Sequence, residues 1–208
     1  MSHAEISPEG EPLRIRSLII SIIAAMMIFH IAEAVADSGV VHQAPPYRLE
    51  RATEDYSYLR DPARRIDFWD PIKYIPFNAD GNWYLSLGGE ARERFEYFNH
   101  PNWGKDQQDH GYLLQRYFLH GDLHMGRHIR LFTQLQSSLE DGRRGGPRPA
   151  DMDELDLHQA FLDLKLDTGG DGSLHLRSGR QELAYGSQRL VSVREGPNVR
   201  RSFDGFRL

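Results

Sequence analysis

The stretch WYLSLGGEARERFEYF, residues 83–98, alternates apolar and polar side chains along almost its whole length. Successive side chains of an extended strand point to opposite faces. One face therefore carries Trp83, Leu85, Leu87, Gly89, Ala91, Phe95 and Tyr97, and the other carries Tyr84, Ser86, Glu90, Arg92, Arg94 and Glu96. Glu93 is the exception on the apolar face. Crossing a bilayer takes a tilted strand of about 9 to 11 residues, and strands of soluble sandwiches rarely sustain alternation for longer. The stretch therefore predicts a membrane-crossing β-strand.

Four further runs of this kind follow, and the connectors between them are alternately long and short. The runs cover residues 112–125, 129–140 and 154–166, and a fifth run begins at residue 173. Gly126-Arg127-His128 is a tight hairpin turn, whereas residues 99–111 and 141–153 are long polar connectors. Transmembrane barrels have short periplasmic turns and long outer loops. The pattern predicts an all-β fold, an antiparallel up-and-down meander of about five or six strands that forms part of a transmembrane β-barrel, with its first strand running outward.

The composition is that of an ordinary folded domain. The chain has 208 residues, a net charge of −5, a hydrophobic fraction of 39% and no cysteine. These values exclude disordered, collagen-like and helical-membrane classes, and they exclude disulfides and thiolate metal sites. A low mean hydropathy is compatible with a barrel, because polar lumen residues dilute the apolar ones.

The N-terminus predicts export. Arg14 and Arg16 precede an apolar stretch from Leu18 to Phe29, and Ala34-Val35-Ala36 is a small-x-small cleavage site. The apolar stretch is shorter than the roughly 18 residues of a spanning helix, which favours a cleaved signal peptide, residues 1–36, over a membrane anchor.

Residues 37–82 are rich in charge, aromatic residues and proline and show no sustained period. We expect an N-terminal periplasmic extension. It is either a plain linker or a segment with a short helix at residues 62–67, in which Asp61 is the N-cap and Pro62 the first helical residue.

The fifth run carries a conflict. The phase of Leu174 and Leu176 would turn Arg180 and Glu182 toward lipid, where an arginine at mid-bilayer costs about 2 to 4 kcal/mol. We therefore expect either a bulge at Gly179 that resets the phase or an early end of the strand.

Several motifs stand out along the chain after the signal peptide. They are residues 67–76 (DFWDPIKYIP), 85–94 (LSLGGEARER), 155–161 (LDLHQAF), 179–183 (GRQEL), 185–191 (YGSQRLV), 198–201 (NVRR) and 203–205 (FDG). On these motifs the chain resembles the alginate export family of bacterial outer-membrane barrels. The resemblance implies a channel in the cell outer membrane that passes an anionic polysaccharide or a small anionic solute. It also implies membrane lipid and the outer-membrane assembly machinery as partners.

One departure from the family concerns size. Family members look like large barrels, whereas bacterial single-chain barrels begin at about eight strands and this chain has about five or six. Residues 83–208 are therefore expected to form a partial, alginate-export-type barrel, and the chain is expected to be a fragment or the product of a truncated gene.

Arginine is the candidate solute-binding residue type, because its planar fork binds the carboxylates of uronate sugars. The candidate lumen-lining residues are Arg92, Arg94, Arg116, Arg130, Arg177, Arg180, Arg189, Arg200 and Arg201. Acidic residues on the same strand faces nearly balance the cations. The alternative, structural ion pairs with partners such as Glu182 or Asp204, therefore stays open.

Other chemistries find little support in the sequence. His120, Asp122 and His124 share a strand face, but no further metal ligand is indicated, so neither a metal nor another cofactor is expected. We find no nucleophile elbow, phosphate loop or zinc motif, and we expect no enzymatic activity and no nucleic-acid binding. The alternative function is a soluble periplasmic all-β protein that binds or cleaves carbohydrate, and a non-functional remnant that never inserts is a third possibility.

Overall fold

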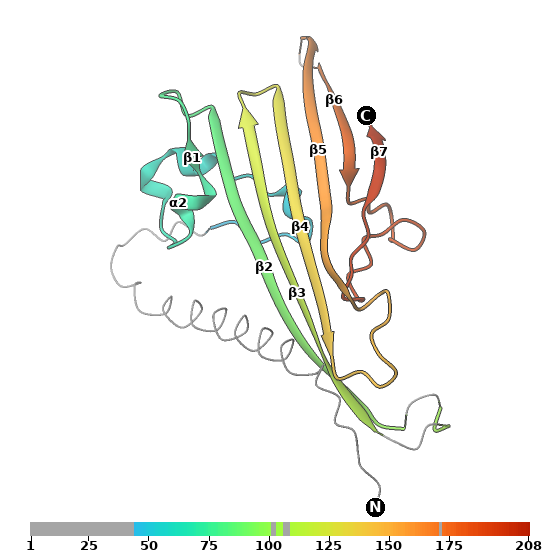
Figure 1. Ribbon diagram of the computed structural model, residues 1–208. Coiled ribbons are helices and arrows are strands. Elements are labelled where there is room, and N and C mark those ends of the chain that lie inside the picture. Colours follow the sequence, from blue (N-terminus) through green and yellow to red (C-terminus); the bar gives the residue numbers. More distant parts are fainter. Residues whose placement is uncertain (1–43, 101–102, 106–108, 171) are drawn as a thin grey trace, which may run out of the picture. The chain divides into compact units, whose positions relative to one another are not determined.

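A single antiparallel sheet dominates the computed structural model, which describes residues 44–100, 103–105, 109–170 and 172–208 (Figure 1). Within these residues the sheet has seven strands in the order of the chain. They are β1 (Ile75–Pro76), β2 (Trp83–Phe98), β3 (His110–Met125), β4 (Ile129–Asp141), β5 (Asp153–Gly169), β6 (Gly172–Gln181) and β7 (Phe203–Arg207). Each strand pairs with the next one, so the predicted all-β, up-and-down meander is confirmed. The predicted signal peptide, residues 1–36, lies outside the described residues.

The connectors keep the predicted alternation of length. In Figure 1 the short turns after β3 and β5 lie at one end of the strands, and the long connectors after β2, β4 and β6 lie at the other. Among the described residues, no helix has both the length and the apolar character that crossing a bilayer requires.

The apolar face of the sheet is exposed and its polar face is buried. On β3, Leu119 is 63% exposed, while its neighbours Phe118 and His120 on the other face are 4% and 5% exposed. Exposed apolar side chains continue this face across the sheet: Phe95, Tyr97, Leu131, Leu135, Leu157, Leu162, Leu166 and Leu174. A soluble sheet has the opposite arrangement, because burial of apolar surface stabilises its fold.

The exception on the apolar face is paired. Glu93 accepts hydrogen bonds from the Tyr117 hydroxyl at 3.0 Å and from Gln115 Nε2 at 3.3 Å. A polar group away from water needs such partners.

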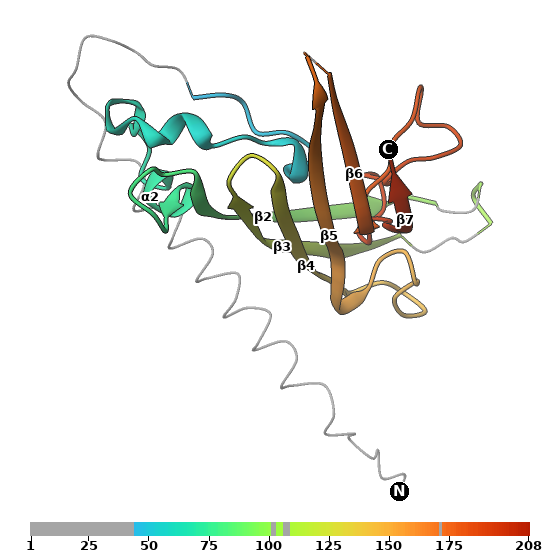
Figure 2. The same cartoon turned by 90° about the horizontal axis from the view of Figure 1, so that it is seen from above.

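The N-terminal segment covers part of the polar face. Its short elements are η1 (Arg51–Thr53), η2 (Ser57–Arg60), η3 (Pro62–Arg64) and α2 (Asp70–Lys73). Ala52 packs against Phe132 and Phe161, and its carbonyl oxygen accepts a hydrogen bond from Arg130 at 2.7 Å. Figure 2 shows this segment, in blue and cyan, running along one side of the sheet. The domain boundary at residue 82 stays a prediction.

The predicted helix start at Pro62 is present as a single turn. The Asp61 carboxylate accepts a hydrogen bond from the Ala63 amide, as an N-cap does, but the turn is a 3-10 helix that ends at Arg64. After this turn, Asp67 is the next residue of the segment that forms an ion pair.

Asp67 and Asp70 hold Lys73 next to β1. The Lys73 ammonium lies 3.0 Å from Asp67 Oδ2 and 3.3 Å from Asp70 Oδ1. Burial alone would raise the pKa of Asp67, but hydrogen bonds from the Trp69 amide and from Lys73 outweigh it and lower the pKa. Burial would lower the pKa of Lys73, but the bond to Asp67 outweighs it and raises the pKa. The segment before β1 is therefore fixed by charge pairing.

The expected bulge at Gly179 is wrong. Pairing between β5 and β6 stays in register from Leu164↔Leu176 to Ala160↔Arg180, so Arg180 keeps the phase of the apolar face. Its charge is neutralised by Asp204 on β7, with Nε and Oδ1 3.0 Å apart. β6 continues through Arg180 and ends at Gln181, so the expected early end of the strand applies to Glu182 and not to Arg180.

A bulge occurs on β5 instead. Gln134 pairs with Gln159 and Leu135 with Leu157, which leaves His158 as the extra residue. His158 and Gln159 are consequently both buried on the polar face. The bulge thus turns a histidine inward that regular alternation would have turned outward.

Replacing Gly179 by alanine should destabilise the sheet. Gly179 has φ +129°, and an added Cβ would lie 2.3 Å from the carbonyl oxygen of Ala160. We expect a loss of about 1 to 3 kcal/mol in the free energy of unfolding, measured by urea titration in detergent. Gly205→Ala is the matched control, since nothing lies within 4 Å of its added Cβ. Equal unfolding midpoints for both variants would contradict the prediction.

Candidate functional site: an arginine cluster on the polar face

The connector between β6 and β7, residues 182–202, folds back onto the polar face of the sheet. Asn198 is fully buried, and its side-chain amide lies 2.9 Å from Gln115 O, 3.1 Å from Leu139 O and 2.9 Å from Asp151 O. The Arg201 amide donates to Val193 O at 2.9 Å and closes a small loop. The connector is therefore anchored on both sides of its tip, residues 194–197.

Asp151 supports this anchor from the connector between β4 and β5. Arg148 binds its carboxylate with two hydrogen bonds, of 2.7 and 3.1 Å, and Arg143 lies 3.0 Å away. Burial alone would raise the pKa of Asp151, but these two guanidinium groups outweigh it and lower the pKa. The carboxylate therefore stays charged, and its backbone carbonyl remains in place for Asn198.

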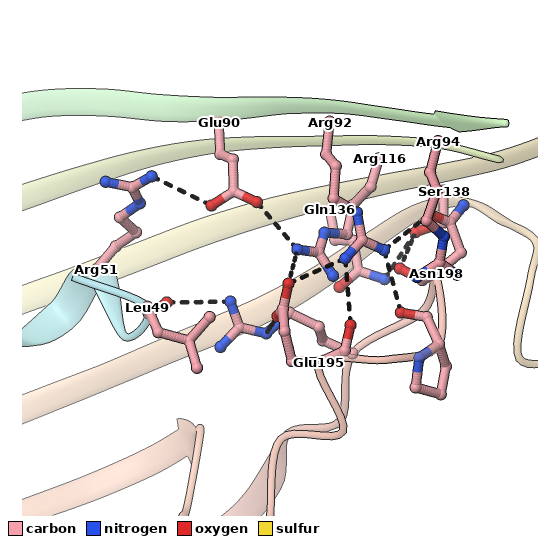
Figure 3. Close-up of polar contacts among 12 residues, drawn as sticks. Leu49, Arg51, Glu90, Arg92, Arg94, Arg116, Gln136, Ser138, Glu195 and Asn198 are labelled. Atoms are coloured by element: carbon pink, nitrogen blue, oxygen red, sulfur yellow. Dashed lines mark hydrogen bonds and ion pairs between the residues drawn. The ribbon is translucent and has the colours of Figure 1, made fainter. Parts of the chain in front are cut away.

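Glu195, at the tip, reaches three arginines. Its Oε1 lies 3.0 Å from Arg92 NH1 and also contacts Arg116 NH2, and its Oε2 lies 3.3 Å from Arg200 Nε. Figure 3 shows how Arg92 from β2, Arg116 from β3 and Glu195 from the connector converge. Arg92 also contacts the Pro197 carbonyl and the Asn198 side chain.

Alternating charges extend from this cluster in both directions. Toward the N-terminal segment, Arg116 binds Glu90 at 2.9 Å, and Glu90 binds Arg51 at 3.2 Å. Toward β5, Arg200 binds Glu182 at 2.9 Å.

His158, on the bulge of β5, ends the chain of contacts, with its Nε2 2.8 Å from Glu182 Oε1. The backbone of Leu49 accepts a further hydrogen bond from Arg200. This chain of contacts joins the N-terminal segment, the sheet and the β6–β7 connector. Removing one partner of a buried ion pair costs about 3 to 5 kcal/mol, so these contacts hold the three segments together.

Arg116 has more donors than partners. Its side chain is 0% exposed, and within the described residues its Nε and NH1 have no hydrogen-bond partner. Arg92 Nε is in the same situation. The cluster can therefore accommodate more carboxylate oxygen than Glu90 and Glu195 supply.

Arg130 and Arg177 form a second group near the short turns. Arg130 binds Asp122 through two hydrogen bonds, of 2.7 and 2.8 Å, and Arg177 binds Asp163 through two, of 2.6 and 2.7 Å. The guanidinium carbon of Arg177 lies 3.7 Å from the centre of the Phe161 ring. Both arginines lie on the same face of the sheet as Arg116, but each is paired with a carboxylate of its own strand neighbour, Asp122 or Asp163.

The other predicted arginines lie elsewhere. Arg94 donates to the Gly196 carbonyl at 2.9 Å and borders a cavity of about 340 Å³ together with Arg148 and Arg194. Arg180 lies on the apolar face. Arg189 and Arg201 are exposed and form no ion pair with any residue that the structure describes. Their assignment as lumen-lining residues stays a prediction.

The side chains of His120, Asp122 and His124, which share a strand face, contact other side chains of the protein. Asp122 binds Arg130 and His124, and the His120 ring stacks on Phe132. Among the described residues, no group of three or more His, Asp or Glu side chains is arranged to hold a metal ion.

Sequence reasoning missed Glu195, Asn198 and His158 as members of the cluster. The Gly196-Pro197 pair is a turn signal that could have marked the tip. The break in alternation around His158 could have marked the bulge. Neither signal reveals which arginines the tip contacts.

An antiparallel up-and-down meander with an exposed apolar face and a buried polar face is typical of the class of transmembrane β-barrel proteins. Residues 83–208 match the Alginate export family, and the chain belongs to this family. It is a family of outer-membrane transport proteins rather than of enzymes. No curated protein and no solved structure matched the chain.

Asn198→Asp should release the connector. A carboxylate cannot donate to the three carbonyl oxygens, and each buried acceptor left without a donor costs about 1 to 3 kcal/mol. We expect trypsin to cleave after Arg189, Arg194 or Arg201 at least about tenfold faster than in the parent protein. Gln188→Glu, an exposed amide-to-acid change in the same connector, is the control and should leave the rate unchanged. Equal cleavage of all three proteins would refute the anchoring role.

Proposed function

We propose that this chain forms part of the wall and lining of an outer-membrane channel that passes an anionic polysaccharide of the alginate kind or a related small anionic solute. The observation that carries the proposal is the division of the sheet into an exposed apolar face and a buried face with arginines from β2, β3 and the β6–β7 connector. Membership of the alginate export family supports it.

The chemistry of the polar face suits a polymer of uronates. Each uronate sugar carries one carboxylate, and guanidinium groups bind carboxylates with paired hydrogen bonds. Arg92 and Arg116 already bind carboxylates of the chain in this region, and each has a donor that bonds no described residue. A channel selects solutes through the charges that line it, so these residues would favour anions.

The apolar face suits lipid as its partner. Its polar exceptions, Glu93 and Arg180, are each paired with a neighbouring side chain, which reduces the cost of placing them next to hydrocarbon. The outer-membrane assembly machinery is the proposed partner for insertion, and the predicted signal peptide supports export.

Leu119→Arg should weaken folding into a bilayer far more than Phe95→Arg. Both side chains lie on the apolar face, but Leu119 is near mid-strand and Phe95 is near the long-connector end. An arginine costs about 2 to 4 kcal/mol at the bilayer midplane and about 0 to 1 near the interface. Urea titration of the protein folded into lipid vesicles measures the difference. Similar losses for both variants would favour the soluble periplasmic alternative.

The function itself is tested by conductance in planar bilayers. We expect the protein to be recovered in the outer-membrane fraction. In planar bilayers we expect it to form anion-selective pores that oligomers of mannuronate block and neutral cello-oligosaccharides do not. Arg189→Glu should lower the anion permeability relative to that of cations without preventing insertion, because this exposed guanidinium forms no ion pair with any described residue.

The control for this experiment is Arg127→Glu, in the short turn at the opposite end of the strands. Arg200 is unsuitable, because a glutamate there would lie beside Glu182 and Glu195 and disturb the fold. Unchanged ion selectivity in Arg189→Glu would argue against a lumen position for this residue, and absence of pores would overturn the proposed function.

A further inference from the structure

The carboxylate of Glu195 occupies the place where a carboxylate of a passing polymer would meet Arg92 and Arg116. We propose that Glu195 is a specificity-determining internal competitor, which holds these arginines until a carboxylate-bearing ligand displaces it. The inference rests on the proposed function, because it names how the same arginine cluster would discriminate among solutes.

The first support is the surplus of donors. Arg116 is fully buried, yet its Nε and NH1 have no hydrogen-bond partner within the described residues, and neither does Arg92 Nε. Buried guanidinium groups normally use most of their donors. A single glutamate side chain therefore fills the site incompletely, and a ligand carboxylate with adjacent hydroxyl groups could use donors that Glu195 leaves idle.

The second support is the position of Glu195 on a loop tip that can move away from the arginines. Its side chain is 36% exposed, in contrast to 0% for Arg116. The tip, residues 194–197, lies between buried Val193 and Asn198, which remain anchored to the sheet and to Arg201. Arg194 has φ +54°, a conformation that costs free energy for a residue with a side chain. Displacing the tip would relieve this strain and leave the anchors intact.

The third support is the charge balance of the cluster (Figure 3). Its cations are Arg51, Arg92, Arg116 and Arg200, and its carboxylates are Glu54, Glu90, Glu182 and Glu195. Moving Glu195 away leaves these four guanidinium groups with three carboxylates, an excess of positive charge that another anion can offset. A neutral sugar cannot replace Glu195, so the displacement step selects for carboxylates.

The affinity of the full chain in detergent micelles tests the proposal. The probe is the tetramer of mannuronate, measured by calorimetry, with cellotetraose as the neutral comparison. Glu195→Gln keeps the shape of the side chain but weakens its hold on the arginines, so we expect about tenfold tighter binding of the tetramer. Glu154→Gln removes the same charge from an exposed site on β5 and should bind like the parent protein.

A second measurement leaves Glu195 intact and so remains informative if Glu195→Gln does not fold. The chain has no cysteine, which makes Gly196→Cys a unique site for a spin label, and nothing lies within 4 Å of the added Cβ. We expect the mannuronate tetramer, and not cellotetraose, to increase the mobility of this label. Gly205→Cys on β7, which is equally open, is the control and should not respond.

The outcomes separate the two proposals. Binding of the tetramer by the parent protein, with unchanged affinity in Glu195→Gln or an unresponsive label at residue 196, overturns the role of Glu195 and leaves the proposed function standing. If neither the folded parent protein nor a folded variant binds the tetramer, both proposals are overturned.

Discussion

A guanidinium group removed from water needs carboxylates beside it, and Arg116 has two of them, Glu90 and Glu195. Glu90 stands on β2, Arg116 on β3, and Glu195 on the connector after β6. Through Glu90 the pairing continues to Arg51 in the N-terminal segment. One buried charge thus connects two irregular segments to the sheet, in addition to the anchors that Asn198 and Arg130 provide.

The distribution of polarity follows from the same requirement. Polar side chains of β2 to β5 face the segments that bond them, and apolar side chains are left to face outward. In water this arrangement would be unfavourable, because it exposes large hydrophobic residues such as Phe95 and Leu119. In a bilayer the apolar face is the compatible one, and the few polar groups on it must be paired, as Glu93 and Arg180 are.

The strands were predictable from the sequence because alternation is a local property. Residues 83–98 form β2 with the bounds that the pattern predicts, and the tight turn at residues 126–128 joins β3 and β4 as expected. The arginine pairings were not predictable, because they depend on where residues 44–60 and 182–202 dock. Gly179 shows the limit of the pattern. The sequence predicted a bulge there that would turn Arg180 away from the apolar face, but Arg180 stays on that face and Asp204 on the neighbouring strand neutralises its charge. The role of His158 was hidden for a similar reason, since the bulge on β5 is defined by its register with β4.

The order of the strands also bears on how the molecule assembles. Each strand pairs with its neighbour in the chain, so hairpins can form from local segments with little loss of chain entropy. The contacts of the arginine cluster join residues much farther apart: 103 positions separate Arg92 from Glu195, and 151 separate Leu49 from Arg200. Closing such long loops costs more chain entropy than pairing neighbouring strands does. The charged contacts therefore raise the contact order of a fold whose sheet is otherwise local, and we expect them to slow its folding.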